Sequence, residues 1–203
     1  MIAPKKKILD KAFNLFLKKS YESVTLREIQ EAANTSRGAI YHHYRSKEDI
    51  YEQVLNEYIL PAFNSYSYID EEEKKNLLNT IYASLKYRQN HLSMLREVTN
   101  SNINNYNFFR MVYEANEHNK NFCEQTNWLM EKEFKGWRNT VQQAMRTGEI
   151  RSDIDIDYTA QYFILTPLGL GNLSAFNKYI HIDTNDVRSI YLKFYNLMKK
   201  SFM

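Results

Sequence analysis

The feature that most constrains this chain is the stretch from residue 25 to residue 49, TLREIQEAANTSRGAIYHHYRSKED. Thr25 can cap a helix, because its hydroxyl can accept a hydrogen bond from the backbone N–H of Glu28 in a capping box. Asn34 tolerates the left-handed backbone of a sharp turn. Ser36 and Ser46 can each cap a further helix. The stretch therefore predicts a helix, a tight turn, a second helix and the start of a third.

The second of these helices has residues suited to contact with DNA. Ser36, Gly38 and Ala39 are small, so they allow the helix backbone to approach another surface closely. Arg37 can form bidentate hydrogen bonds to the edge of a guanine. Further donors follow at Tyr41, His42, His43, Tyr44 and Lys47. In a helix-turn-helix, the second helix lies in the DNA major groove. The alternative is an ordinary corner between two helices, with the tyrosines and histidines partly in the core, since such corners also occur outside DNA-binding proteins.

The stretch resembles the DNA-binding segment of the tetracycline-repressor (TetR) family of transcriptional regulators. The resemblance covers roughly the first 55 residues and departs from the family mainly at Asn34, where the family usually has glycine. The residues that carry it are Ile8, Ala12, Phe16, Tyr21, Thr25, Ile29, Ala33, Ser36, Gly38 to Tyr41, His43, Tyr44 and Ser46 to Ile50.

The resemblance implies an all-α protein with an N-terminal three-helix head at residues 1–46. It also implies a ligand-sensing and dimerisation body at residues 47–203, in which residues 47–62 form a linking helix. We expect Arg37 to read a base directly, with Arg27 as a second candidate. Gly38 and Ala39 allow close approach and can touch a thymine methyl group. Thr25, Tyr41, His43 and Lys47 are expected at phosphates, and Ser36 and His42 complete the predicted DNA-binding set.

Charge and composition are compatible with this reading. Residues 1–50 carry a formal charge of +4 and residues 51–203 carry −1, so the basic excess lies with the helix-turn-helix, which suits phosphate contact, although a few surface lysines could also produce it. The chain has only five glycines and three prolines, which favours long helices. No apolar run approaches the roughly 20 residues that span a bilayer. The single Cys123 cannot form an internal disulfide, which suits a cytoplasmic protein.

Apolar periodicity predicts the remaining helices. Pro61 falls in the helix that begins at Lys47, where a proline either kinks the helix into a hinge or simply ends it. Gly148 is expected to terminate a long helix in the left-handed conformation, and Asp183 or Thr184 to cap the last one. The predicted helices cover residues 4–19, 77–88, 91–98, 108–117, 121–147, 157–176 and 185–200, with loops at 65–75 and 100–107.

The helix predicted at 157–176 is apolar nearly all round, and the helix at 185–200 has a broad apolar stripe. Such a helix must be covered on more than one side. Burial inside a monomer is one possibility. We expect instead that these two helices form a homodimer interface, because a two-fold axis doubles the base contacts of a helix-turn-helix.

Catalytic and metal-binding patterns are absent from the sequence, so an enzyme is not expected. His42 and His43 are adjacent, and His118 and Cys123 are five residues apart, which are both poor spacings for shared metal coordination. The body is rich in aromatic residues that could line a ligand pocket. We expect each of these to be core more often than ligand contact: Tyr82, Tyr113, Trp128, Phe134 and Trp137.

The sequence as a whole predicts a sequence-specific DNA-binding regulator without a cofactor or a membrane. The resemblance implies a repressor that binds a palindromic double-stranded DNA operator and is released from it by a small-molecule effector. The sequence does not give the identity of that effector. The alternative is a helical module that uses the same head to bind protein and has no salt-sensitive affinity for DNA.

Overall fold

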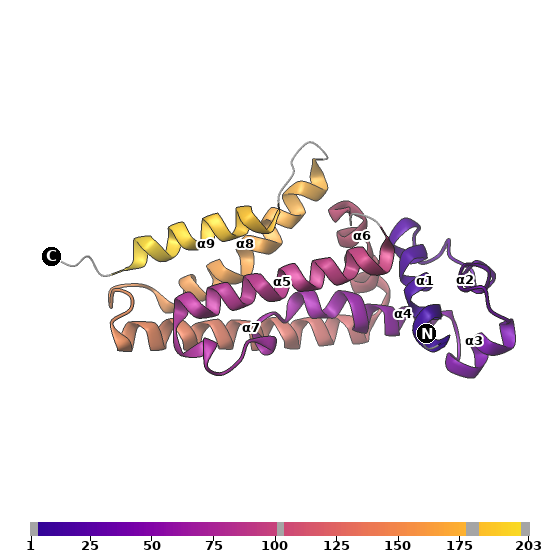
Figure 1. Ribbon diagram of the computed structural model, residues 1–203, viewed down its shortest axis with the longest axis horizontal. Coiled ribbons are helices and arrows are strands. Elements are labelled where there is room, and N and C mark those ends of the chain that lie inside the picture. The colour runs from indigo at the N-terminus through magenta and orange to yellow at the C-terminus, as the bar shows by residue number, and fades with distance from the viewer. Residues whose placement is uncertain (1–3, 101–103, 178–182, 200–203) are drawn as a thin grey trace. The chain divides into compact units, whose positions relative to one another are not determined.

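The computed structural model describes residues 4–100, 104–177 and 183–199, and the regular elements in them are helices (Figure 1). The all-α prediction is therefore confirmed. Contacts divide the chain into two compact units: unit 1 holds residues 1–62 and 92–126, and unit 2 holds residues 63–91 and 127–203. Unit 1 extends beyond the predicted head because α6 (Asn105–His118) packs against α1 (Pro4–Lys18). The predicted functional division at residue 46 stays a prediction.

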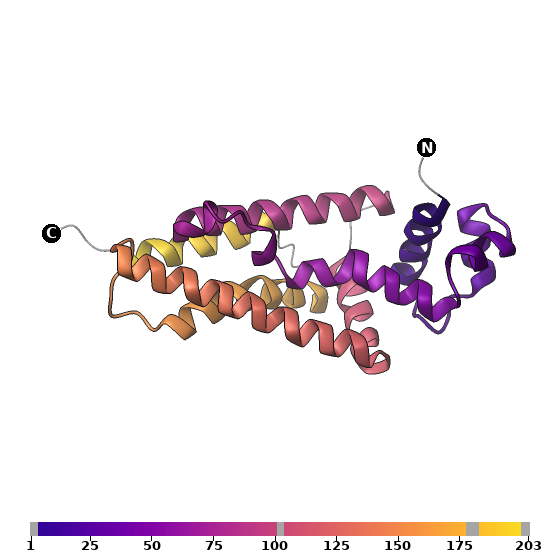
Figure 2. The same ribbon diagram turned by 90° about the horizontal axis from the view of Figure 1, so that it is seen from below.

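Unit 1 contains the predicted helix-turn-helix. Its helices α2 (Leu26–Ala33), α3 (Arg37–His43) and α4 (Lys47–Val54) follow α1, and Figures 1 and 2 both show α1, α2 and α3 grouped together. Helix α1 contacts α2, α3 and α4, so it packs across the helix-turn-helix as expected. The shared core is fully buried and includes Phe13, Phe16, Ile29 and Ile40.

The helix that begins at Lys47 changes type before Pro61. The α4 segment is followed by a π-helical turn, Leu55–Ile59, and then by a 3₁₀ turn, Leu60–Phe63. Pro61 has no N–H, and its ring disfavours a regular helical turn before it. The N–H of Leu60 accordingly bonds to the carbonyl of Leu55, five residues back. The helical chain therefore continues past Pro61 to Phe63, but not as a regular α-helix.

Two predictions for the middle of the chain were wrong. The predicted helices at 77–88 and 91–98 are one helix, α5 (Leu77–Thr99), because Leu85 and Leu95 on either side of the expected break are both buried. Helix α6 starts at Asn105, where Asn104 caps it, so it includes part of the expected loop at 100–107. Residues 101–103 of that loop lie outside the described residues. The expected loop at 65–75 contains 3₁₀ turns at Tyr66–Tyr68 and Glu73–Lys75.

The later helices agree with the prediction to within a residue or two. They are α7 (Lys120–Thr147), α8 (Ile156–Phe176) and α9 (Thr184–Met198). Gly148 has φ = 77° after α7, and Asp183 caps α9. Residue 200, the expected end of the last helix, lies outside the described residues. No helix in the described ranges is both long and apolar enough to cross a membrane.

The core of unit 2 is built around Trp137, which is fully buried on α7. Its ring stacks on Phe163 of α8 with centroids 4.6 Å apart, and the ring of Tyr191 of α9 meets Phe163 edge-on at 5.0 Å. The Tyr191 hydroxyl also donates to the carbonyl of Phe163. That carbonyl would otherwise lack its helical partner, because the residue four positions on is Pro167, which has no N–H. The aromatic core thus stabilises a proline inside α8.

A second cluster in unit 2 forms between Tyr66 and one face of α7. The Tyr66 hydroxyl lies 2.8 Å from the Thr140 hydroxyl, and the Tyr66 backbone N–H donates to buried Glu133 at 2.8 Å. Gly136 lies between those two contacts in sequence, and a Cβ at that position would be 2.3 Å from the Tyr66 ring. This glycine is therefore required for the close approach of an aromatic ring to the helix.

The expectation that the body aromatics are core residues was partly wrong. Trp137 is fully buried and Phe134 is half-buried against the core of unit 2. However, Tyr82, Tyr113 and Trp128 have 41%, 57% and 59% of their surface exposed. Sequence periodicity places a residue on a face, but it does not tell how far that face is covered.

Candidate nucleic-acid interface

Local capping bonds fix the turn between α2 and α3. Thr25 and Glu28 form the predicted capping box: the Glu28 N–H donates to the Thr25 hydroxyl at 3.2 Å, and the Thr25 N–H donates to the Glu28 carboxylate at 2.8 Å. Asn34 has φ = 46° in the left-handed region, as its position in the turn predicts. The hydroxyls of Ser36 and Ser46 then cap α3 and α4. All four predictions are confirmed.

Lys19 reinforces the start of α2. Its ammonium lies 2.5 Å from the Glu28 carboxylate. The hydrogen bond from Lys19, followed by those from Thr25, holds the pKa of Glu28 down at about 2. The capping carboxylate is therefore charged at neutral pH, which suits the positive end of the helix dipole.

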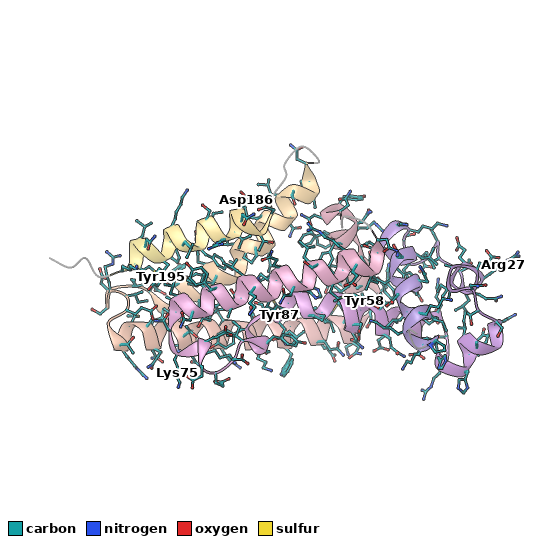
Figure 3. The ribbon with its side chains drawn as sticks, in the orientation of Figure 1. Arg27, Tyr58, Lys75, Tyr87, Asp186 and Tyr195 are labelled. Carbon is teal, nitrogen blue, oxygen red and sulfur yellow. The ribbon has the colours of Figure 1, made fainter. Side chains whose placement is uncertain are left out.

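Most of the predicted DNA-binding side chains are accessible on the surface. Thr25, Arg27, Ser36, Arg37, Gly38, Tyr41 and His42 are exposed, and Ala39, His43 and Lys47 are half-exposed. The Arg27 side chain is 86% exposed and lies at the outer edge of α2 (Figure 3). By contrast Tyr44 is buried, and its hydroxyl donates to the carbonyl of Lys5 at 2.9 Å. The corner therefore has a core tyrosine at Tyr44 and a polar surface elsewhere.

The two arginines on this surface are held differently. Arg27 Nε donates to Glu31 at 2.9 Å, and this hydrogen bond raises the pKa of Arg27. The guanidinium of Arg37 instead lies over the ring of Tyr41, 5.5 Å from its centroid. Glu31 had not been predicted to contribute, although its spacing of four residues from Arg27 is typical of helical ion pairs.

A hollow of about 330 Å³ lies between α2 and α3. It brings together Arg27 and Arg37, the two predicted base-reading residues, and Tyr41, a predicted phosphate contact. Gln30, which the sequence analysis did not select, lies beside them. The complete lining is Leu26, Arg27, Gln30, Arg37, Ile40 and Tyr41.

Lys47 is more closely engaged with the protein than its predicted role suggests. Its ammonium donates to the carbonyl of Tyr21 at 3.1 Å and lies 4.2 Å from the centroid of the Tyr21 ring. The Tyr21 hydroxyl donates to Glu48 at 2.9 Å. Burial, followed by this hydrogen bond to Glu48, raises the pKa of Tyr21. Lys47 therefore fixes the segment before α2, whatever else it contacts.

The adjacent rings of His42 and His43 meet edge-on at the end of α3, with centroids 4.8 Å apart. Within the part of the chain that the structure describes, no three histidine, cysteine or acidic side chains are grouped so as to hold a metal ion.

The fold and this surface define an all-α protein of the helix-turn-helix class. A family model described as "Bacterial regulatory proteins, tetR family" matches residues 8–54. The chain is 23% identical over 161 residues to the HTH-type transcriptional repressor KstR2 of Rhodococcus jostii, which covers 76% of this chain and 72% of that protein. It is 41% identical over 51 residues to the biofilm operon regulator IcaR of Staphylococcus aureus, or 25% of this chain and 27% of that one.

Solved structures show the same fold. A transcriptional regulator from Saccharomonospora viridis, crystallised with choline, matches with a TM-score of 0.69 at 19% identity, and 95% of each chain is covered. The chain belongs to the TetR family of DNA-binding transcriptional regulators, and that family consists of regulators rather than enzymes.

Proposed function

We propose that this protein is a homodimeric repressor that a small-molecule effector releases from a palindromic DNA operator. The observation that carries the proposal is the exposed surface of α2 and α3, where Arg27, Arg37 and Tyr41 line one hollow. Arg37 and Arg27 would read bases. Thr25, Tyr41, His43 and Lys47 would contact phosphates, and Ser36, Gly38, Ala39 and His42 complete the surface. A regulator acting on a bacterial chromosome would work in the cytoplasm.

The dimer proposal is supported by apolar side chains that unit 2 leaves uncovered. Tyr158, Leu165, Leu173 and Phe176 of α8 are 75%, 58%, 48% and 89% exposed, and Leu197 of α9 is 74% exposed. Exposed apolar side chains gathered on two helices are typical of an interface. A second copy placing the same two helices against them would form the isologous contact of a two-fold dimer.

Effector control is supported by the relatives. KstR2 is a repressor, and the Saccharomonospora regulator is in complex with choline. Within unit 1, Arg110 of α6 donates to the α1 carbonyls of Phe16 and Leu17, each at 3.0 Å. A shift of α6 would therefore be transmitted to the helix that packs across α2 and α3. An effector that binds better to one arrangement would shift the population away from DNA.

The test of DNA binding is selection of bound duplexes from a random pool at two salt concentrations. We expect a palindromic consensus, whose half-site spacing gives the distance between the two recognition helices. Arg37→Ala should relax the preference at one base step. Lys47→Ala should weaken binding to all sequences and lower the salt slope by about one unit. Unchanged binding by both variants would refute the assignment of these residues.

The test of the dimer is analytical ultracentrifugation of Leu165→Glu. Gln143→Glu is the matched control, because it places the same charge on an exposed polar position of α7, outside the two helices of the proposed interface. We expect the Leu165 variant to sediment as a monomer and the control as a dimer. A dimer in both would exclude this face as the interface. Release of the selected operator in a small-molecule screen would then identify the effector.

A further inference from the structure

The hollow between α2 and α3 contains one polar side chain that differs chemically from the others. Arg27 and Arg37 carry only donors, and the Tyr41 hydroxyl is a single group. Gln30 is the lining residue with a carboxamide, which offers two N–H donors and a carbonyl acceptor on one planar group. Guanine presents two acceptors in the major groove, whereas adenine presents one acceptor and one donor. The arginines therefore match guanine, and Gln30 matches adenine.

The backbone of Gln30 is held firmly in place. Its carbonyl accepts hydrogen bonds from the N–H groups of Asn34 and Thr35, the latter at 3.2 Å, which closes the last turn of α2. Asn34 then takes the left-handed conformation that leads into α3. The position of Gln30 is consequently fixed by the same turn that positions Arg37. Such preorganisation reduces the entropy lost when the side chain binds.

The side chain of Gln30, by contrast, is available to bind a ligand. Among residues 4–100, 104–177 and 183–199 its carboxamide has no hydrogen-bond partner, and it is half-exposed at the hollow. Its neighbour Arg27, three residues earlier on the same face of α2, is paired with Glu31. A polar side chain whose backbone is held in place, and which lies unpaired beside two base-reading candidates, is suited to contact a base edge.

We propose that Gln30 reads an adenine in the major groove and is a specificity-determining residue of the operator contact. This inference rests on the proposed function, because it needs DNA to lie against α2 and α3. Its carboxamide would accept from adenine N6 and donate to adenine N7.

The experiment is selection from a random duplex pool with the full-length protein, followed by competition binding. The variants are Gln30→Ala and Gln30→Glu. Gln143→Ala is the control, an exposed glutamine on α7 that lies in unit 2 and outside the hollow. Gln30→Ala should lose discrimination at one A·T pair of each half-site by about 5- to 140-fold, with the rest of the consensus unchanged. Gln30→Glu should exchange adenine for cytosine there, because a carboxylate accepts from cytosine N4.

The outcomes separate this inference from the function on which it rests. If the parent protein yields a palindrome and both Gln30 variants keep its consensus with equal discrimination, Gln30 reads no base. A uniform loss of affinity for all sequences would likewise show a structural role and overturn the proposal. If the parent selects no consensus at all, the proposed function itself fails.

Discussion

Replacing Glu133 with alanine should strongly destabilise unit 2. The Glu133 side chain is 2% exposed, and its Oε1 atom accepts from the hydroxyl of Ser65 at 2.5 Å and from the indole N–H of Trp137 at 3.3 Å. Its Oε2 atom accepts from the backbone N–H of Tyr66 at 2.8 Å, and Arg88 Nη2 lies 3.8 Å from Oε1. One carboxylate thus satisfies three donors and faces a cation.

The expected magnitude follows from what is left behind. Glu133→Ala leaves those three donors without their acceptor and Arg88 without its counter-ion, and removal of one partner of a buried pair costs about 3–5 kcal/mol. Glu133→Gln keeps one oxygen but turns an NH₂ group toward a donor, so its cost is about 1–3 kcal/mol. Either loss is large against a total folding free energy of about 5–15 kcal/mol.

The assay is urea unfolding followed by far-UV circular dichroism, with the free energy of unfolding extrapolated to water. Glu131→Ala is the matched control on the same helix. The Glu131 side chain is 71% exposed, and its ion pair with Lys135 spans 3.8 Å, so its loss should cost less than about 0.5 kcal/mol. If both Glu133 variants unfold within about 0.5 kcal/mol of this control, the carboxylate does not stabilise the cluster and the reasoning fails.

Three further predictions concern stability. Gly136→Ala should destabilise the protein by about 1–3 kcal/mol and lower its melting temperature, because the added Cβ would clash with the Tyr66 ring. This loss is expected even though alanine favours helices more than glycine does. An unchanged melting temperature would contradict the close approach of the ring to the helix. Asn34→Ala should cost about 1–2 kcal/mol at its left-handed φ, whereas Asn34→Gly should be nearly neutral, as urea unfolding would show; equal effects would refute the argument. Burial raises the pKa of Tyr191 above the ordinary value of 10, so the folded state favours the neutral phenol. That contribution to stability is complete below pH 10 and is lost as pH rises further, so unfolding at a fixed urea concentration should increase from pH 10 upward, and less so in Tyr191→Phe.

The helix-turn-helix was predictable in detail because its determinants are local. Thr25, Ser36 and Ser46 each bond to a backbone N–H three residues ahead. Asn34 needs no partner outside the turn to take its left-handed conformation. Capping therefore depends on residues that lie within one helical turn of each other, and the linear sequence shows all of them.

The errors occurred where distant residues decide the structure. The polar residues between Leu85 and Leu95 read as a break, but burial on both flanks keeps α5 continuous. Trp128 and Tyr113 were expected in the core yet stay exposed. The sequence did not single out Gln30, because Gln30 lies beside Arg37 only after α2 and α3 have packed together.

The sequence by itself determined the helical class and the turn geometry of the head, since periodicity and capping are encoded by near neighbours in the chain. The resemblance to the family likewise lay in the linear pattern of residues in the head. Tertiary structure alone decided the hollow that joins Gln30 to the two arginines and the burial of Glu133 under Tyr66. It also placed the Tyr191 hydroxyl where it donates to the Phe163 carbonyl, which receives no helical hydrogen bond from Pro167. Each of these depends on side chains from different segments meeting in space, where burial makes every unpaired polar group costly.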